Sequence, residues 1–109
     1  MDLFQLYEKD VQRTTNPDLT EKESLVEAAL GLASEAGEAA GVIKKWATQG
    51  HDLDTEAVIG EAGDTLYYLA RMLNHVGSTI SEAMFTNMEK RRKRYPRGFD
   101  PERSRNREG

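Results

Sequence analysis

The chain has 109 residues, of which 38% are hydrophobic and 31% charged, with a formal net charge of −4, and this length fits one domain with a modest core. It contains no cysteine, which excludes disulfides, thiolate metal sites and cysteine nucleophiles and suits a reducing cytoplasm. The N-terminal MDLFQLYEKD lacks the basic start and apolar run of a signal peptide, and no apolar stretch approaches the roughly 20 residues that span a bilayer. We therefore expect a cytoplasmic protein with no membrane partner.

Helical signals dominate the chain, and no segment shows the alternation of a convincing strand. The first helix is expected over residues 3–14, with Asp2 as its N-cap. The second helix opens at the capping box Thr20-x-x-Glu23 and extends to about residue 46.

The second half of the chain contains two further helical segments. Gly50 stops the second helix, and an aspartate at position 52 or 54 caps the third, which is expected over residues 55–76. Another capping box begins at Thr79 and opens a fourth helix that ends near Arg94.

Short connections between the last three helices predict an antiparallel arrangement. We therefore expect an all-α fold: an antiparallel bundle of about four helices within residues 1–99, assembled as an oligomer. The polar residues 100–109 are expected to form a disordered tail. Residues 90–109 hold nine Lys/Arg against three Asp/Glu, a balance of +6, so the body of the chain is strongly acidic.

Small residues are frequent on the two central helices, where glycine costs about 1 kcal/mol relative to alanine. Their presence predicts close approach of the two backbones or access to a site. The positions concerned are Ala36, Gly37, Ala39 and Gly41 on the second helix and Ala62 and Gly63 on the third.

Two carboxylate pairs lie on these helices, Glu35 with Glu38 and Glu61 with Asp64. Each pair has i, i+3 spacing, so its two side chains leave the same face of the helix. Each borders the apolar stripe, where an unpaired acid is costly to place. If the stripes pack together, the four acids converge along one edge of the interface, and a hard cation such as Mg²⁺ is the natural ligand.

Two other interpretations of these charges remain. In a chain that is 31% charged, some acid pairs arise by chance and merely face solvent. The basic C-terminal segment also allows a non-enzymatic helical assembly module that binds nucleic acid through phosphates. The chain has no Glu-x-x-His, which disfavours a di-iron bundle, and no Gly-rich phosphate loop of the Walker type.

The acid pattern E-x-x-E, followed after 22 residues by E-x-x-D, resembles the motif of the MazG-like all-α nucleoside triphosphate pyrophosphohydrolases. The segments GLASEAGEAAGVIKK, GEAGDTLYYLA and NMEKRRKRYPRGF are similar to helices two, three and the end of helix four in that family. The resemblance covers about residues 20–99. It implies hydrolysis of a nucleoside or deoxynucleoside triphosphate to the monophosphate and pyrophosphate, with Mg²⁺ or Mn²⁺ and in a homodimer or homotetramer.

Carried over by position, the resemblance makes four acids the metal ligands and catalytic residues: Glu35, Glu38, Glu61 and Asp64. It also implies that substrate phosphates are contacted from the fourth helix and its end, by Asn87, Lys90, Arg94 and Tyr95. Some members of the family carry an additional Glu just before the first ligand, which the resemblance implies to be the base, and here that position is Ser34. The group that activates the water is therefore left open.

Two more residues after the first acid pair are candidates for substrate binding. Lys44 is placed to reach phosphate, and Trp46 to stack on a base. A Trp that continues an apolar stripe is more often part of the core or of an oligomer interface, which we favour for Trp46. The preferred base and sugar do not follow from the sequence.

Overall fold

The computed structural model describes residues 1–107, and the elements in this range are all helices. Five helices follow in order: α1 Leu3–Thr14, α2 Glu21–Thr48, α3 Thr55–His75, α4 Ile80–Arg94 and α5 Pro101–Arg105. The all-α class is therefore confirmed. The four helices expected from the sequence begin and end within two residues of the predicted bounds.

Local signals account for the helix ends. The capping box of α2 closes in both directions: the Thr20 N–H donates to Glu23 Oε1 at 2.9 Å, and the Glu23 N–H donates to Thr20 Oγ1 at 3.1 Å. Asp54 caps α3 by accepting from the Ala57 N–H at 3.0 Å. Gly50 ends the turn after α2 with φ +73°, a left-handed conformation that favours glycine.

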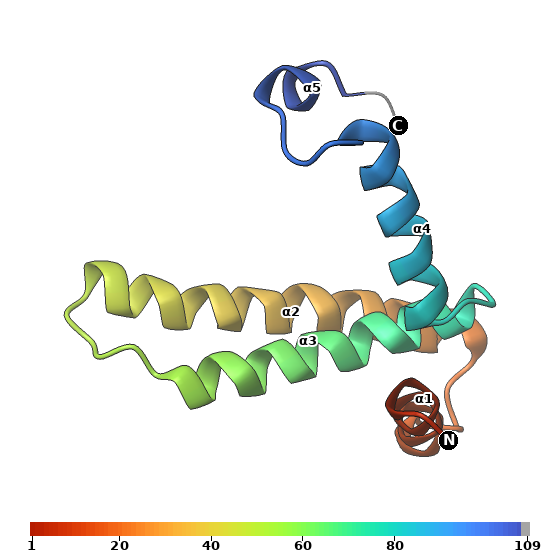
Figure 1. The fold of residues 1–109 in the computed structure, drawn as a ribbon. Helices are drawn as coiled ribbons and strands as arrows, with labels where there is room; N and C mark the ends of the chain where they lie inside the picture. The colour runs from red at the N-terminus through yellow and green to blue at the C-terminus, as the bar shows by residue number, and fades with distance from the viewer. Residues whose placement is uncertain (108–109) are drawn as a thin grey trace.

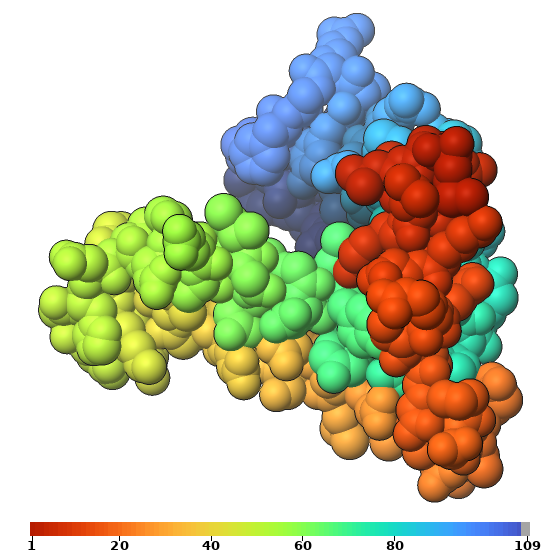
Figure 2. All heavy atoms as spheres, turned by 90° about the horizontal axis from the view of Figure 1, so that it is seen from below, coloured from red at the N-terminus to blue at the C-terminus, as the bar shows by residue number. Residues whose placement is uncertain are grey.

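Helices α2 and α3 form a long antiparallel hairpin, and α1 lies across its base (Figure 1). Seen from below, α1 covers the base beside the start of α4, while the tip of the hairpin projects away (Figure 2). A hydrogen bond joins α1 to the start of α4, because Glu8 Oε1 accepts from the Ile80 N–H at 3.0 Å. The base is therefore held by residues far apart in the sequence.

The arrangement differs from the expected four-helix bundle in one respect. Helix α4 leaves the base of the hairpin at a steep angle and does not pack along α2 and α3 (Figure 1). Part of the segment expected to be disordered is helical, because Asp100 accepts from the Glu102 N–H at 2.9 Å and caps α5. The last two positions of that segment, 108–109, lie outside the described residues.

The buried core of this single chain is small. Val11, Ala70 and Ile80 form its centre, with Tyr7, Tyr67 and Leu73 packed against it. Many large apolar side chains stay exposed among the described residues, including Leu30 at 67% and Ile59 at 72%. Within residues 1–107, none of the helices combines the length and apolar character needed to cross a bilayer.

Candidate metal site on the helical hairpin

Three of the four predicted acids meet between α2 and α3. Glu35 and Glu38 come from α2 and Glu61 from α3, and one carboxylate oxygen of each lies within 4.8 Å of the other two. Their i, i+3 spacing places both α2 acids on the side that faces α3. Glu35 and Glu61 are half-buried, whereas Glu38 is exposed. The hairpin therefore gathers three oxygen ligands from two rigid elements.

The environment of Glu61 reflects this crowding of negative charge. A hydrogen bond with Glu35 raises the pKa of Glu61 most, followed by desolvation and by the charges of Glu35 and Asp64, whereas a hydrogen bond with Glu38 acts in the opposite direction. Its Oε2 atom is buried and has no hydrogen-bond partner among the described residues. A buried acceptor of this kind is costly unless it has a partner.

The donor set fits a hard cation. Mg²⁺ binds oxygen ligands at about 2.0–2.1 Å in octahedral geometry, so opposite ligands lie about 4.2 Å apart. Oxygens that already lie within 4.8 Å of one another need only small side-chain adjustments to reach this geometry. Glu61 Oε2, buried and unpartnered in this part of the chain, is available as one such ligand. The cluster is thus chemically suited to a metal ion.

Asp64, the fourth predicted ligand, is not among the three acids whose oxygens converge. It is exposed on α3, and its charge contributes to the raised pKa values of Glu61 and Tyr7. For Tyr7, desolvation by burial is the larger cause. Asp64 therefore lies near the cluster without completing it.

The predicted substrate-binding residues lie elsewhere on the chain. Lys44 and Trp46 lie on α2 toward the hairpin tip, where Trp46 is 50% exposed. On α4, Asn87 and Lys90 line a shallow recess with the end of α3. At the end of α4, the Arg94 guanidinium lies 5.8 Å from the centroid of the Tyr95 ring.

Helix α4 departs from the hairpin at its base, whereas the acids lie partway along α2 and α3, so the backbone that carries the basic residues runs away from the acids (Figure 1). The α2 residues Lys44 and Trp46 follow the acids on the same helix, six and eight residues after Glu38. The chain therefore assembles part of the predicted site and leaves the phosphate-binding part apart from it.

Of the two explanations expected for the small residues, close approach within the chain is not found at the three glycines named, whereas access to a site stays a prediction. A Cβ placed on Gly37, Gly41 or Gly63 would meet nothing within 4 Å, so these glycines face open space. Close approach occurs instead at Gly31, where a Cβ would lie 2.6 Å from ring atoms of Tyr68. The i, i+4 relationship of Gly31 to Glu35 was the available sequence signal, but it does not reveal which aromatic residue opposes the glycine.

A buried arginine next to this contact was not anticipated. Arg71 is only 3% exposed; its Nη1 donates to Glu27 Oε1 at 2.6 Å and its Nη2 to Ser24 Oγ at 3.0 Å. Its guanidinium also lies 5.9 and 5.7 Å from the ring centroids of Tyr67 and Tyr68. An isolated Arg in the apolar context LARML was the one sequence hint of a buried pair.

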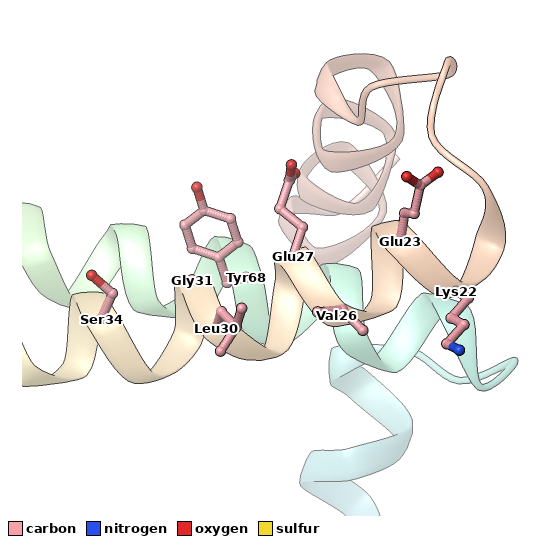
Figure 3. A pocket seen from close by; sticks show the side chains of 8 residues that line it. All are labelled: Lys22, Glu23, Val26, Glu27, Leu30, Gly31, Ser34 and Tyr68. Carbon is pink, nitrogen blue, oxygen red and sulfur yellow. The ribbon is translucent and has the colours of Figure 1, made fainter.

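An open pocket of about 790 Å³ extends along the same edge of the hairpin, on α2 and Tyr68 of α3. Figure 3 shows the side chains of Ser34, Tyr68 and Glu27 projecting to one side of α2, each ending in oxygen. Leu30 lies on another side of the helix and contributes apolar surface. The pocket lies toward the base from the acid cluster, because Gly31 in its lining precedes Glu35 by one helical turn on the same face of α2.

In comparison with known protein families, the model of the MazG nucleotide pyrophosphohydrolase domain matches residues 23–99. The match spans most of the chain and includes α2, α3 and α4 with all four predicted acids. Neither the curated proteins nor the solved structures contain a match.

Proposed function

Because the chain belongs to the MazG nucleotide pyrophosphohydrolase domain family, we propose that it hydrolyses nucleoside or deoxynucleoside triphosphates to the monophosphate and pyrophosphate. One observation carries this proposal beyond the family: the convergence of Glu35, Glu38 and Glu61 within 4.8 Å. A solvated acid face does not require such convergence across two helices, and like charges brought this close oppose folding unless a cation binds.

We assign Mg²⁺, or Mn²⁺ with similar oxygen preference, to this cluster. Glu35, Glu38 and Glu61 would hold the ion, and Asp64 would join them after a change of rotamer. The bound ion supplies neutralisation of phosphate oxygens and activation of the water that attacks the α-phosphorus. The side chains of the hairpin fix the position of this charge, which is the main contribution of protein to phosphoryl chemistry.

The serine at position 34 limits which groups could accept the proton of the attacking water. It occupies the position at which some relatives carry the additional Glu, and a serine hydroxyl is a poor general base at neutral pH. The attacking water would therefore be activated in one of two ways: the ion would lower its pKa so that the proton leaves to solvent, or one of the four carboxylates would accept the proton. The exposed Glu38 is the most accessible member of the converged group.

We further propose that the protein acts as a homo-oligomer. Large exposed apolar side chains on three helices support this, including Leu30 at 67%, Ile59 at 72% and Phe85 at 60%. A second copy would also supply the phosphate-binding side chains of α4, Lys90 and Arg94 among them, which one chain holds apart from its own acids. Sedimentation equilibrium tests this, and a monomer at working concentration would contradict it.

The decisive experiment measures pyrophosphate release from a panel of NTPs and dNTPs, with Mg²⁺ and with EDTA, for wild type and Glu38→Gln. Monophosphate and pyrophosphate formed only with Mg²⁺ and lost in the variant would support the assignment and rank the substrates. Absence of turnover with every nucleotide would reject it. The non-enzymatic module with a nucleic-acid-binding tail would then be the better explanation of the charges.

A further inference from the structure

We propose that the pocket of Gly31, Ser34, Tyr68 and Glu27 receives the nucleoside of the substrate, and that Glu27 selects cytosine and adenine, whose amino groups stand at position 4 of the pyrimidine and position 6 of the purine. This inference rests on the proposed function, because it places the base beside the acids that would hold the metal and the phosphates. It assigns the side chain that distinguishes cytosine and adenine from their carbonyl counterparts.

The position of the pocket fits an extended nucleotide. Gly31 lies one turn before Glu35 on α2, and Tyr68 lies one turn after Asp64 on α3. Glu27 and Glu35 are eight residues apart, or about 12 Å along the helix at 1.5 Å per residue. The phosphates at the acid cluster and the base at Glu27 would therefore occupy consecutive segments of the same edge of the hairpin.

The wall of the pocket suits a planar base. Tyr68 presents its aromatic ring to the pocket because Gly31 has no side chain to displace it. Aromatic rings stack on any base, so this surface provides affinity without sequence preference. Selectivity must come from a polar group at the same place.

Glu27 provides that polar group in a fixed position. Its Oε1 accepts from Arg71 Nη1 at 2.6 Å, and Arg71 is itself held by Ser24 and stacked near Tyr68. In the hydrogen bonding of residues 1–107, Glu27 Oε2 is not engaged, and the side chain is 48% exposed. A carboxylate accepts hydrogen bonds and donates none. The free oxygen therefore offers an acceptor to whatever enters the pocket.

The hydrogen-bonding groups of the bases determine which nucleotides the pocket would prefer. The amino groups of cytosine and adenine donate hydrogen bonds, whereas uracil and hypoxanthine present a carbonyl oxygen at the equivalent position. A carbonyl facing the Glu27 carboxylate leaves two acceptors opposed and unpaired. We expect about a tenfold preference for the amino member of each pair, since Glu27 is half-exposed and charge-assisted hydrogen bonds to such groups are worth roughly this factor.

Binding tests the inference without any turnover. ¹⁵N-labelled wild type is titrated with CMP and with UMP, which differ in the group at position 4, in the presence of Mg²⁺. CMP should shift the amide resonances of Gly31 and Tyr68 and bind about ten times more tightly than UMP. Equal affinities would overturn the role of Glu27. Unchanged Gly31 and Tyr68 resonances would overturn the pocket, as expected if a second copy of the chain covers it.

Activity provides a second, separate readout. The ratio of kcat/KM is measured for CTP against UTP and for ATP against ITP, in wild type, Glu27→Gln and the control Glu56→Gln at the first turn of α3. The amide of Glu27→Gln keeps an acceptor for Arg71, and its NH₂ group can donate to a carbonyl, so the ratio should fall toward one. A ratio unchanged from wild type would refute the assignment. Failure to hydrolyse any nucleotide would refute the proposed function, while the CMP titration still decides the pocket.

Discussion

The ring of Tyr68 lies against Gly31, so closely that a Cβ on this glycine would be 2.6 Å from ring atoms Cδ1 and Cε1. This contact brings α2 and α3 together beside the acid cluster, and it sets the direction in which the Tyr68 ring faces the pocket. The absence of a side chain at Gly31 thus allows the Tyr68 ring to pack directly on α2 at this point of the hairpin.

Replacing Gly31 by alanine should therefore destabilise the protein. The ring of Tyr68 or the helix must move, and such overpacking costs about 1–3 kcal/mol. Gly37→Ala on the same helix is the matched control, because its Cβ meets nothing within 4 Å. It should stabilise by about 0.5–1 kcal/mol through helix propensity. Urea unfolding of both variants measures this, and equal effects would contradict the contact.

Removal of Glu27 should lower the free energy of unfolding more than removal of its ion-pair partner Arg71. Their side chains are 3% and 48% exposed, so Glu27→Ala leaves a buried cation whereas Arg71→Met leaves a carboxylate that water reaches. We expect losses of about 3 kcal/mol for the former and about 1 kcal/mol for the latter.

An exposed pair provides the control for this comparison. Arg92 and Glu89 are 71% and 42% exposed, and Glu89→Ala should cost less than about 1 kcal/mol. Chemical denaturation of the three variants gives the values. If Arg71→Met proved the more destabilising of the two, the guanidinium would contribute mainly through its packing on Tyr67 and Tyr68.

The capping box of α2 should make stability depend on pH in the acid range. The hydrogen bonds with the Thr20 backbone and side chain lower the pKa of Glu23 in the folded state. A lowered folded pKa means that the unfolded chain binds the proton first, so this stability is complete above the unfolded pKa. It is lost as the pH falls through the folded pKa.

Comparison of wild type with Glu23→Gln measures this effect. The amide keeps a hydrogen-bond acceptor for the Thr20 N–H but has no charge to lose. The wild type should therefore be more stable at neutral pH, and the two unfolding free energies should converge in strong acid. A gap that stays constant over the whole range would show that the carboxylate charge contributes nothing.

Glu38→Gln and Asp64→Asn should each lower turnover strongly and leave the fold intact. The loss of one charged ligand is expected to lower kcat on the order of 10²–10³-fold, as for other groups that stabilise transition-state charge. Mg²⁺ should also raise the melting temperature of wild type and not of either variant, since a ligand that binds only the native state stabilises it.

The two substitutions test different parts of the metal site. Glu38 belongs to the three acids within 4.8 Å, whereas Asp64 lies outside them. Wild-type activity in Asp64→Asn alone would leave a three-carboxylate site, and wild-type activity in Glu38→Gln would remove the metal assignment. Far-ultraviolet circular dichroism establishes that both variants retain the helical fold.

The elements of this fold were predictable because their signals are local. The capping box at Thr20 and Glu23 and the left-handed Gly50 act within a few residues, so they mark helix ends in the sequence itself. The convergence of Glu35, Glu38 and Glu61 followed from helix periodicity combined with an antiparallel pair. The burial of Arg71 could not be predicted in this way, because its partners Ser24 and Glu27 lie 47 and 44 residues away in the sequence.

The direction of α4 also escaped prediction, since it depends on contacts at the base of the hairpin. Asp64, which the sequence groups with the other acids, is not among the three whose carboxylate oxygens converge, and its role as a metal ligand stays a prediction. Gly31, which meets Tyr68, was not among the small residues singled out from the sequence, because the residue of α2 that faces Tyr68 depends on the rotation of α2 about its axis.

The hydrogen bond from the Ile80 N–H to Glu8 joins α1 to the first residue of α4. A carboxylate at a helix N-terminus both satisfies a free N–H group and interacts favourably with the helix dipole. Glu8 lies outside the residues matched by the family model, 23–99, and yet it anchors the start of the helix that carries the basic side chains. Helix α1 thus helps to fix the position of α4 at the base of the hairpin. The placement of α4 within the family domain therefore depends partly on residues that precede the matched range, 23–99.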